Sequence, residues 1–199
     1  MSRNLADFKF KCNRCGFCCS YLGLIVNLTP RDVQLLARTL KASARDLLKV
    51  VGFYQVKAFD ESKRALIEER MVLPPLKTNK GFAYIGLLKH EDGRCVFLQG
   101  KKCVMYRARP RICQSFPFSF QEKGAGATIS IGSFATTNCP GIGEGKPVNV
   151  AKVKLQGKST MRDISQYKRF AKWWNGRDSK DPRHWTPLIL LKSMLAFEP

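Results

Sequence analysis

The chain has 199 residues, of which 44% are hydrophobic, so it can build the core of one ordinary globular domain, and extensive disorder is not expected. Its 35 lysines and arginines against 15 aspartates and glutamates give a net charge of +20, which favours a polyanionic partner, either nucleic acid or an anionic membrane face. No apolar run approaches the roughly 20 residues that span a bilayer, and the N-terminus lacks the apolar core of a secretory signal. We therefore expect a soluble, cytoplasmic protein with no membrane partner.

Residues 8–11 alternate phenylalanine with lysine, which is typical of a short strand. The segment KCNRCGFCC follows and contains Cys12, Cys15, Cys18 and Cys19. Two-residue spacers let successive sulfur atoms converge on one point, which is how thiolates ligate metals. Disulfides within this crowded segment would be strained, because Cys18 and Cys19 are adjacent. Metal ligation is therefore the favoured interpretation, and a disulfide-rich protein from a hyperthermophile is the alternative.

An apolar run over residues 21–28 predicts a strand, and two helices are expected after it. Thr29, followed by proline and then by an aspartate three residues on, predicts a helix over residues 30–40. Ser43 gives a similar start signal for a second helix that runs to about residue 51. The residues expected to face the core are Val33, Leu36, Leu40, Leu47, Leu48 and Val51.

The middle of the chain, residues 53–88, has the pattern of antiparallel strands near residues 65–73 and 82–88. The next segment, GRCVFLQGKKCVMY, contains two short apolar pieces around a glycine-containing turn, which predicts a β-hairpin. This hairpin would bring Cys95 and Cys103 close together as a second ligand-bearing element.

The last two cysteines lie beside prolines. Cys113 stands between two prolines, and Cys139 follows a strand predicted over residues 127–135 and precedes a proline, as the last ligand does in bacterial ferredoxin runs. Three arginines alternate just ahead of Cys113: Arg107, Arg109 and Arg111. They could neutralise a thiolate cluster, bind phosphates or form a solvated surface, and the sequence leaves these roles open.

After residue 141 cysteine disappears and lysine becomes frequent, so the chain divides into a cysteine-cluster domain over residues 1–140 and a basic, partly helical extension over residues 141–199 that packs on it. Apolar residues at helical spacing predict a helix over residues 160–174, and residues 188–197 form a final apolar segment that docks on the core. The face of the helix expected to be buried carries Ile164, Tyr167, Phe170, Ala171 and Trp174.

The combined pattern CxxCGxCC, GxCxFL with a later Cys and Tyr, and RPxxCxxFP with a final cysteine resembles the YkgJ-type cysteine-cluster family of zinc- or iron-chelating domains. The resemblance spans about residues 8–140 and implies that eight thiols serve a metal centre. Through a family relative, the flagellin lysine N-methylase, it also implies a link to lysine methylation. The matching residues are Cys12, Cys15, Gly16, Cys18, Cys19, Cys95, Phe97, Leu98, Cys103, Tyr106, Arg109, Pro110, Cys113, Phe116 and Pro117.

A metal centre of this kind predicts an α+β fold, a small irregular single domain organised around the cysteine ligands. Structural zinc usually takes separated CxxC or CxxH pairs, whereas crowded cysteines are typical of iron–sulfur loops, so a [4Fe-4S] cluster is favoured and Zn²⁺ is the alternative. Eight thiols also suffice for two centres, while His90 and His184 lack ligand spacing to any cysteine. The candidate metal ligands are Cys12, Cys15, Cys18, Cys19, Cys95, Cys103, Cys113 and Cys139.

No catalytic constellation stands out, and no glycine-rich nucleotide-binding unit accompanies the cysteines. The charge favours structured RNA, in particular ribosomal RNA with its ribosomal proteins. Exposed Tyr167, Trp173 or Trp174 could stack on unpaired bases, although at helical spacing they could equally fill the core. The candidate RNA contacts are Arg107, Arg109, Arg111, Lys152, Lys154, Lys158, Arg162, Lys168, Arg169 and Lys172.

The sequence therefore predicts a metal-stabilised RNA-binding protein that is associated with the ribosome or is a small ribosomal component. The alternative is a metalloenzyme of the cysteine-cluster family, either similar to a lysine N-methylase or active in redox chemistry.

Overall fold

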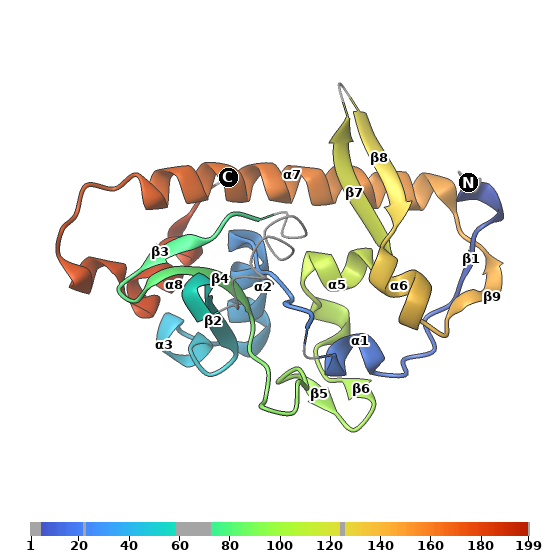
Figure 1. Cartoon of the computed structure of the whole chain (residues 1–199), viewed down its shortest axis with the longest axis horizontal. Helices are drawn as coiled ribbons and strands as arrows, with labels where there is room; N and C mark the ends of the chain where they lie inside the picture. The colour runs from blue at the N-terminus through green and yellow to red at the C-terminus, as the bar shows by residue number, and fades with distance from the viewer. Residues whose placement is uncertain (1–4, 22, 59–72, 124–125, 199) are drawn as a thin grey trace.

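The computed structural model describes residues 5–21, 23–58, 73–123 and 126–198 of the chain. Figure 1 shows the longest helix, α7 (Val150–Asn175), as a rod along one side of the molecule, with most other elements packed beneath it and the hairpin of β7 and β8 extending past it. No helix among the described residues combines the length and the apolar character needed to cross a membrane. The fold is α+β, as the sequence predicts.

The elements follow one another along the chain with short connections. The α-helices are α1 (Phe17–Ser20), α2 (Pro30–Leu40), α3 (Ala44–Leu47), α5 (Arg111–Ser115), α6 (Ser133–Asn138), α7 and α8 (Pro187–Ala196). The strands are β1 (Lys9–Phe10), β2 (Val51–Gln55), β3 (Leu76–Thr78), β4 (Gly81–Leu87), β5 (Leu98–Gln99), β6 (Lys102–Cys103), β7 (Phe118–Lys123), β8 (Gly126–Ile131) and β9 (Ile142–Pro147). Short 3-10 helices span Leu5–Asp7, Val56–Ala58, Tyr106–Ala108 and Pro182–Trp185.

The central sheet is antiparallel with the strand order β2-β4-β3. Residues 21–28, predicted as a strand, join it through a single bridge between Asn27 and Gly86. The prediction is wrong because β3 already pairs with one edge of β4 as far as Ala83, which leaves that edge free only around Gly86. The run is buried as expected, since Val26 and Leu28 belong to the core.

The two helix starts are confirmed, because Thr29 and Ser43 each form a capping box with the aspartate three residues later. The second helix is shorter than predicted. Val51 begins strand β2 instead, since the segment VGFYQ pairs along its whole length with β4. Val51 is buried all the same, whereas Leu40, expected to face the core, is 38% exposed at the last residue of α2.

Strand β4 matches the strand predicted near residues 82–88, and the one predicted over residues 65–73 lies almost wholly outside the described residues. The strand predicted over residues 127–135 ends early, at Ile131, and α6 follows it. Its partner β7 begins at Phe118, directly after Pro117, which has no N–H to extend the ladder. Helix α7 begins ten residues earlier than the helix predicted over residues 160–174, capped by the Asn149 side chain.

Helix α7 crosses two packing environments. Its C-terminal half, with the buried residues Tyr167 and Trp174, joins the core formed by α2, α3, α8 and the central sheet. The Tyr167 hydroxyl donates to Pro74 O, and Trp174 Nε1 donates to Lys77 O, each at 2.8 Å. The N-terminal half lies against β7 and α5, where Gly157 packs so closely on Phe120 that an added Cβ would lie 2.8 Å from the ring.

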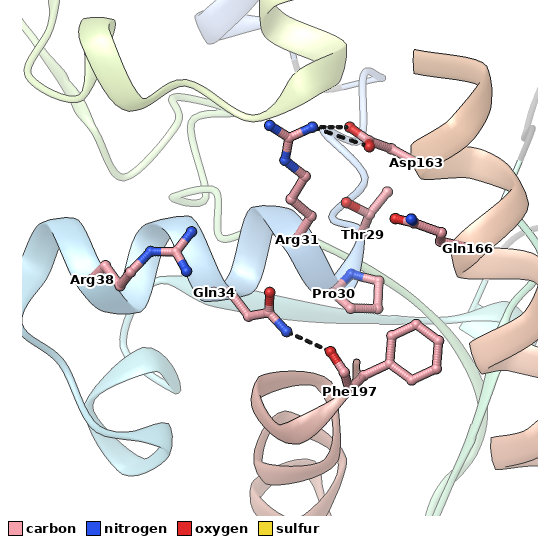
Figure 2. A pocket seen from close by; sticks show the side chains of 8 residues that line it. All are labelled: Thr29, Pro30, Arg31, Gln34, Arg38, Asp163, Gln166 and Phe197. Carbon is pink, nitrogen blue, oxygen red and sulfur yellow. Dashed lines mark hydrogen bonds and ion pairs between the residues drawn. The ribbon is translucent and has the colours of Figure 1, made fainter. Parts of the chain in front are cut away.

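Two buried carboxylates connect α5 to α2 and α7. Arg111, the first residue of α5, donates its backbone N–H to Asp32 Oδ1 and its side-chain Nε to Asp163 Oδ2, both at 2.8 Å. Burial raises the pKa of Asp32, although hydrogen bonds from Thr29 and Arg111 oppose this effect. Figure 2 shows the second guanidinium on Asp163, from Arg31, at 3.2 Å.

Figure 2 also shows a hollow of about 210 Å³ beside this ion pair. The Gln34 side chain crosses its floor and donates to Phe197 O at 2.8 Å, which fastens the end of the chain to α2. None of the eight residues that line the hollow is a cysteine.

We predict that Asp163→Asn lowers the free energy of unfolding by about 3 kcal/mol, because Arg111, only 16% exposed, would keep its charge without a carboxylate partner. Urea unfolding followed by circular dichroism measures the change. Asp181→Asn is the control, since its ion pair with Arg183 lies at the surface and should contribute little. Equal stability of Asp163→Asn and the wild type would contradict the prediction.

Candidate functional site

The N-terminal cysteine segment forms a tight turn followed by one turn of helix. Arg14 and Gly16 have φ values of 57° and 79°, and the Cys15 N–H donates to the Asn13 side chain at 3.2 Å. Helix α1 then carries Cys18 and Cys19, whose sulfur atoms lie 3.9 Å apart. The prediction of a turn-rich loop that needs a glycine is therefore confirmed, because φ at Gly16 lies in the left-handed region.

The hairpin of β5 and β6 lies directly against this loop. The Cys95 N–H donates to Cys19 O at 2.7 Å, and Leu98 pairs with Cys103 in the hairpin, as the sequence predicts. An added Cβ on Gly16 would lie 3.5 Å from the Leu98 side chain, so the loop and the hairpin are in contact. Cys95 and Cys103 thus lie on the element that supports Cys18 and Cys19.

Cys139 approaches the same loop from the other side. It follows α6, and two residues later the Lys11 N–H donates to Gly141 O at 3.1 Å. An added Cβ on Gly141 would lie 2.3 Å from Lys11 O, so this close approach requires glycine. Strands β1 and β9 continue the contact as an antiparallel pair, which holds Cys139 beside Cys12.

Aromatic rings fasten α1 to α6. Phe17 and Tyr21 flank the cysteines of α1, and both stack on Phe134 of α6, with ring centres 6.0 and 4.8 Å from it. Phe116 packs against the other side of Phe134 at 6.3 Å. Sequence reasoning singled out Phe116 but not Phe17, Tyr21 or Phe134, because no spacing relates rings that are more than 100 residues apart in the chain.

One set of thiols interacts at the buried side of the loop. A hydrogen bond from Cys19 lowers the pKa of Cys18 to about 7, and Arg109 and Lys89 favour the same thiolate. The same hydrogen bond raises the pKa of Cys19, together with burial and the negative potential of Cys18, Cys113 and Cys95. Burial and the neighbouring thiolates likewise raise the pKa values of Cys113 and Cys95.

A second set lies at the exposed side. Cys12 and Cys15 are exposed, and after burial their negative potential is what raises the pKa of Cys139. All eight cysteines are free thiols. Across the described ranges, no three Cys, His, Asp or Glu side chains already have the spacing of a closed metal site. The donor set nevertheless suits a soft cation, because thiolates that disfavour one another's ionisation are stabilised together when a metal binds.

Positive side chains accompany the thiols. Arg109 lies over the Tyr106 ring with its guanidinium carbon 3.8 Å from the ring centre, and Arg14 lies 4.5 Å from that centre. Half-buried Lys89, which sequence reasoning missed, donates from Nζ to Tyr21 O and to Gly93 O, the latter at 3.0 Å. Burial lowers the pKa of Lys89, and the nearby thiolates oppose this. Arg107 is exposed at the surface.

The candidate RNA contacts fall into two groups. Arg111 is bound to Asp163 and Arg109 lies near Cys18 and Cys113, so these two belong to the interior of the fold. The contacts proposed on α7 are all exposed: Lys152, Lys154, Lys158, Arg162, Lys168, Arg169 and Lys172. His90 and His184 are exposed too, and His184 Nδ1 lies 2.7 Å from Ser179 Oγ.

Comparison with known proteins gives the chain a family. Residues 11–140, well over half of the chain, match the family model CxxCxxCC, described as "Putative zinc- or iron-chelating domain". The chain is also 30% identical over 146 residues to the protein called "Uncharacterized protein MJ0661" from Methanocaldococcus jannaschii. That match covers 71% of this chain and 64% of the relative, so the chain spans less than two thirds of the relative's length. No solved structure matches the chain.

The family match begins one residue before Cys12 and ends one residue after Cys139, so it contains every cysteine of the chain. The elements that it covers include the loop, the β5–β6 hairpin, α5 and α6, which are the ones that carry the thiols. Sequence, structure and comparison therefore agree that this chain is a member of the CxxCxxCC family of metal-chelating, cysteine-cluster domains.

Proposed function

We propose that this chain is a metal-stabilised RNA-binding protein that associates with the ribosome, and that its metal centre is a [4Fe-4S] cluster. The observation that supports RNA binding best is the outer face of α7, which is basic along its length and bears no exposed carboxylate. The only acidic residue of α7 is Asp163, which is 2% exposed and paired with Arg31 and Arg111.

The basic side chains follow the helical repeat. Lys154, Lys158, Arg162, Arg169 and Lys172 share the solvent face, opposite the buried stripe that includes Phe170 and Trp174. From the first to the last they cover about 27 Å of helix. We call this set the basic stripe. Evenly spaced cations without intervening anions suit a phosphate backbone, which binds them through counterion release whatever its base sequence.

The position of α7 relative to the thiols supports a structural role for the metal. Arg111 on α5 is bound to Asp163 on α7, and Cys113 lies two residues after Arg111. A metal held by these thiols would therefore also fix the underside of the helix that carries the basic stripe. In this proposal the metal supplies rigidity, and α7 supplies the RNA contacts.

The cluster type follows from the donors. The two histidines are exposed, and the donors gathered at the loop are thiols, a set that iron–sulfur clusters share with zinc sites built from four cysteines. Crowding of Cys18 and Cys19 in one helical turn favours the iron–sulfur cluster. Cys18, Cys19, Cys95 and Cys113 would hold it, and Arg109 and Lys89 would offset its negative charge.

We predict that protein purified without oxygen contains iron and sulfide and absorbs visible light, and that removal of the metal lowers the midpoint of thermal unfolding, since the ligands tie separate segments together. Elemental analysis and calorimetry test this. The matched variants are Cys113→Ser, which should lose metal, and Ser193→Ala, a half-buried position on α8 far along the chain, which should not. Colourless protein with stoichiometric zinc would replace the cluster assignment, and protein with neither metal would contradict the proposal.

For RNA binding, we predict that replacing Lys154 and Lys158 by alanine weakens binding to ribosomal RNA and reduces the slope of log K against log salt by about 1 to 2, because two phosphate contacts are lost. Filter binding at several salt concentrations measures both. The matched control replaces Lys49 and Lys192, which are exposed outside α7, so that the net charge changes equally. Equal effects of the two pairs would show that overall charge, and not the stripe, governs binding.

Ribosome association has its own test. In gradients of native cell extract the protein should sediment with ribosomal particles at low salt and leave them at high salt. Free migration at low salt would contradict this part of the proposal even if purified RNA still binds.

A further inference from the structure

We propose that Trp173 is a stacking platform for an unpaired base, so that the RNA bound by α7 is single-stranded where it passes the C-terminal end of this helix. This inference rests on the RNA-binding function proposed above. It assigns phosphates to the basic stripe and one base to Trp173.

Among three aromatic residues that could contact bases, the structure leaves one accessible. Tyr167 and Trp174 are almost fully buried, and their polar atoms are already bonded to backbone carbonyls of residues 74 and 77. Trp173 is 53% exposed on the same helix. A large ring left in solvent at the end of a cationic stripe has no role in the core, because its neighbours Phe170 and Trp174 already fill that space.

The ring of Trp173 is held in place by those neighbours. Its centre lies 5.7 Å from that of Phe170 and 6.3 Å from that of Trp174. The Arg177 guanidinium lies over Trp174 at 4.3 Å and 5.8 Å from the Trp173 ring centre. A ring already fixed by packing loses little conformational entropy when a base stacks on it.

The charges around Trp173 suit an RNA strand. Arg169 lies one turn earlier on the same face, and Lys172 is adjacent, both exposed. The C-terminal end of a helix carries the negative end of its dipole, so it disfavours phosphate more than a neutral base. Phosphates are therefore expected along the stripe toward Lys154, and the base at the Trp173 end.

Stacking also selects the form of the RNA. The faces of bases inside a duplex are covered by their neighbours, whereas an unpaired base can place its whole face on an aromatic ring. The basic stripe binds phosphates of either form. Trp173 should therefore distinguish single strands from duplexes, which the lysines and arginines of α7 cannot do alone.

The test measures binding of an oligouridylate of about 12 nucleotides and of an RNA duplex of similar length, with the wild type, Trp173→Ala and Trp173→Phe. We expect Trp173→Ala to weaken oligouridylate binding by about 5- to 100-fold, to leave duplex binding unchanged and to keep the slope of log K against log salt. Trp173→Phe, which keeps a ring, should recover most of the loss. Thermal unfolding verifies that the variants fold.

Several results would overturn the assignment. They are unchanged oligouridylate binding by Trp173→Ala, an equal loss on single strand and duplex, or a loss only of binding to vesicles of anionic phospholipid. If the Lys154 and Lys158 variant still weakens RNA binding in the same experiment, the RNA-binding function survives and only the stacking platform fails. If the wild type binds neither RNA at low salt, the proposed function itself fails.

Discussion

The pairing of Arg111 with two buried carboxylates is the constraint on which the arrangement of this molecule depends. Its backbone N–H is bonded to Asp32, which also caps α2, and its guanidinium is bonded to Asp163 on α7. Three helices from distant parts of the chain are thereby fixed at one point. Buried charges are retained only when each has partners, so moving any one of the three helices would leave an uncompensated charge inside the protein. The position of Cys113, one half-turn beyond Arg111, follows from the same contacts.

The thiols provide a second connection of a different kind. The aromatic rings between α1 and α6, the Lys11–Gly141 contact and the backbone bond from Cys95 to Cys19 bring the cysteine-bearing elements together through neutral interactions. Mutual repulsion of thiolates opposes the last step of convergence, since the charged form of each sulfur is disfavoured by its neighbours. A bound metal cation reverses the sign of that interaction. Packing therefore brings the ligands near one another, and metal binding accounts for why so many thiols stay together.

Local signals in the sequence predicted what local physics determines. The capping boxes at Thr29 and Ser43, the glycine of the cysteine loop and the buried face of α7 around Tyr167 were all recognisable, because each depends on residues within a few positions of one another. Strand β2 and the limited pairing of residues 21–28 were not, because competition for the two edges of β4 decides them. The role of Lys89 beside the thiols was hidden for the same reason, since it arises only when segments far apart in sequence meet.

The outer face of α7 is difficult to explain as a device for stability. Like charges at i and i+4, as at Lys154 and Lys158 and again at Lys158 and Arg162, each destabilise a helix by about 0.2–0.5 kcal/mol. A single exposed glutamate among them would relieve this, yet the helix has none. The inner face can tolerate the cost, because burial of a side chain such as Trp174 or Phe170 contributes about 1.5–3 kcal/mol. Folding therefore permits the uniform positive face but does not require it. A feature that costs stability and lies wholly on the surface is better explained by a polyanion bound there than by the fold itself.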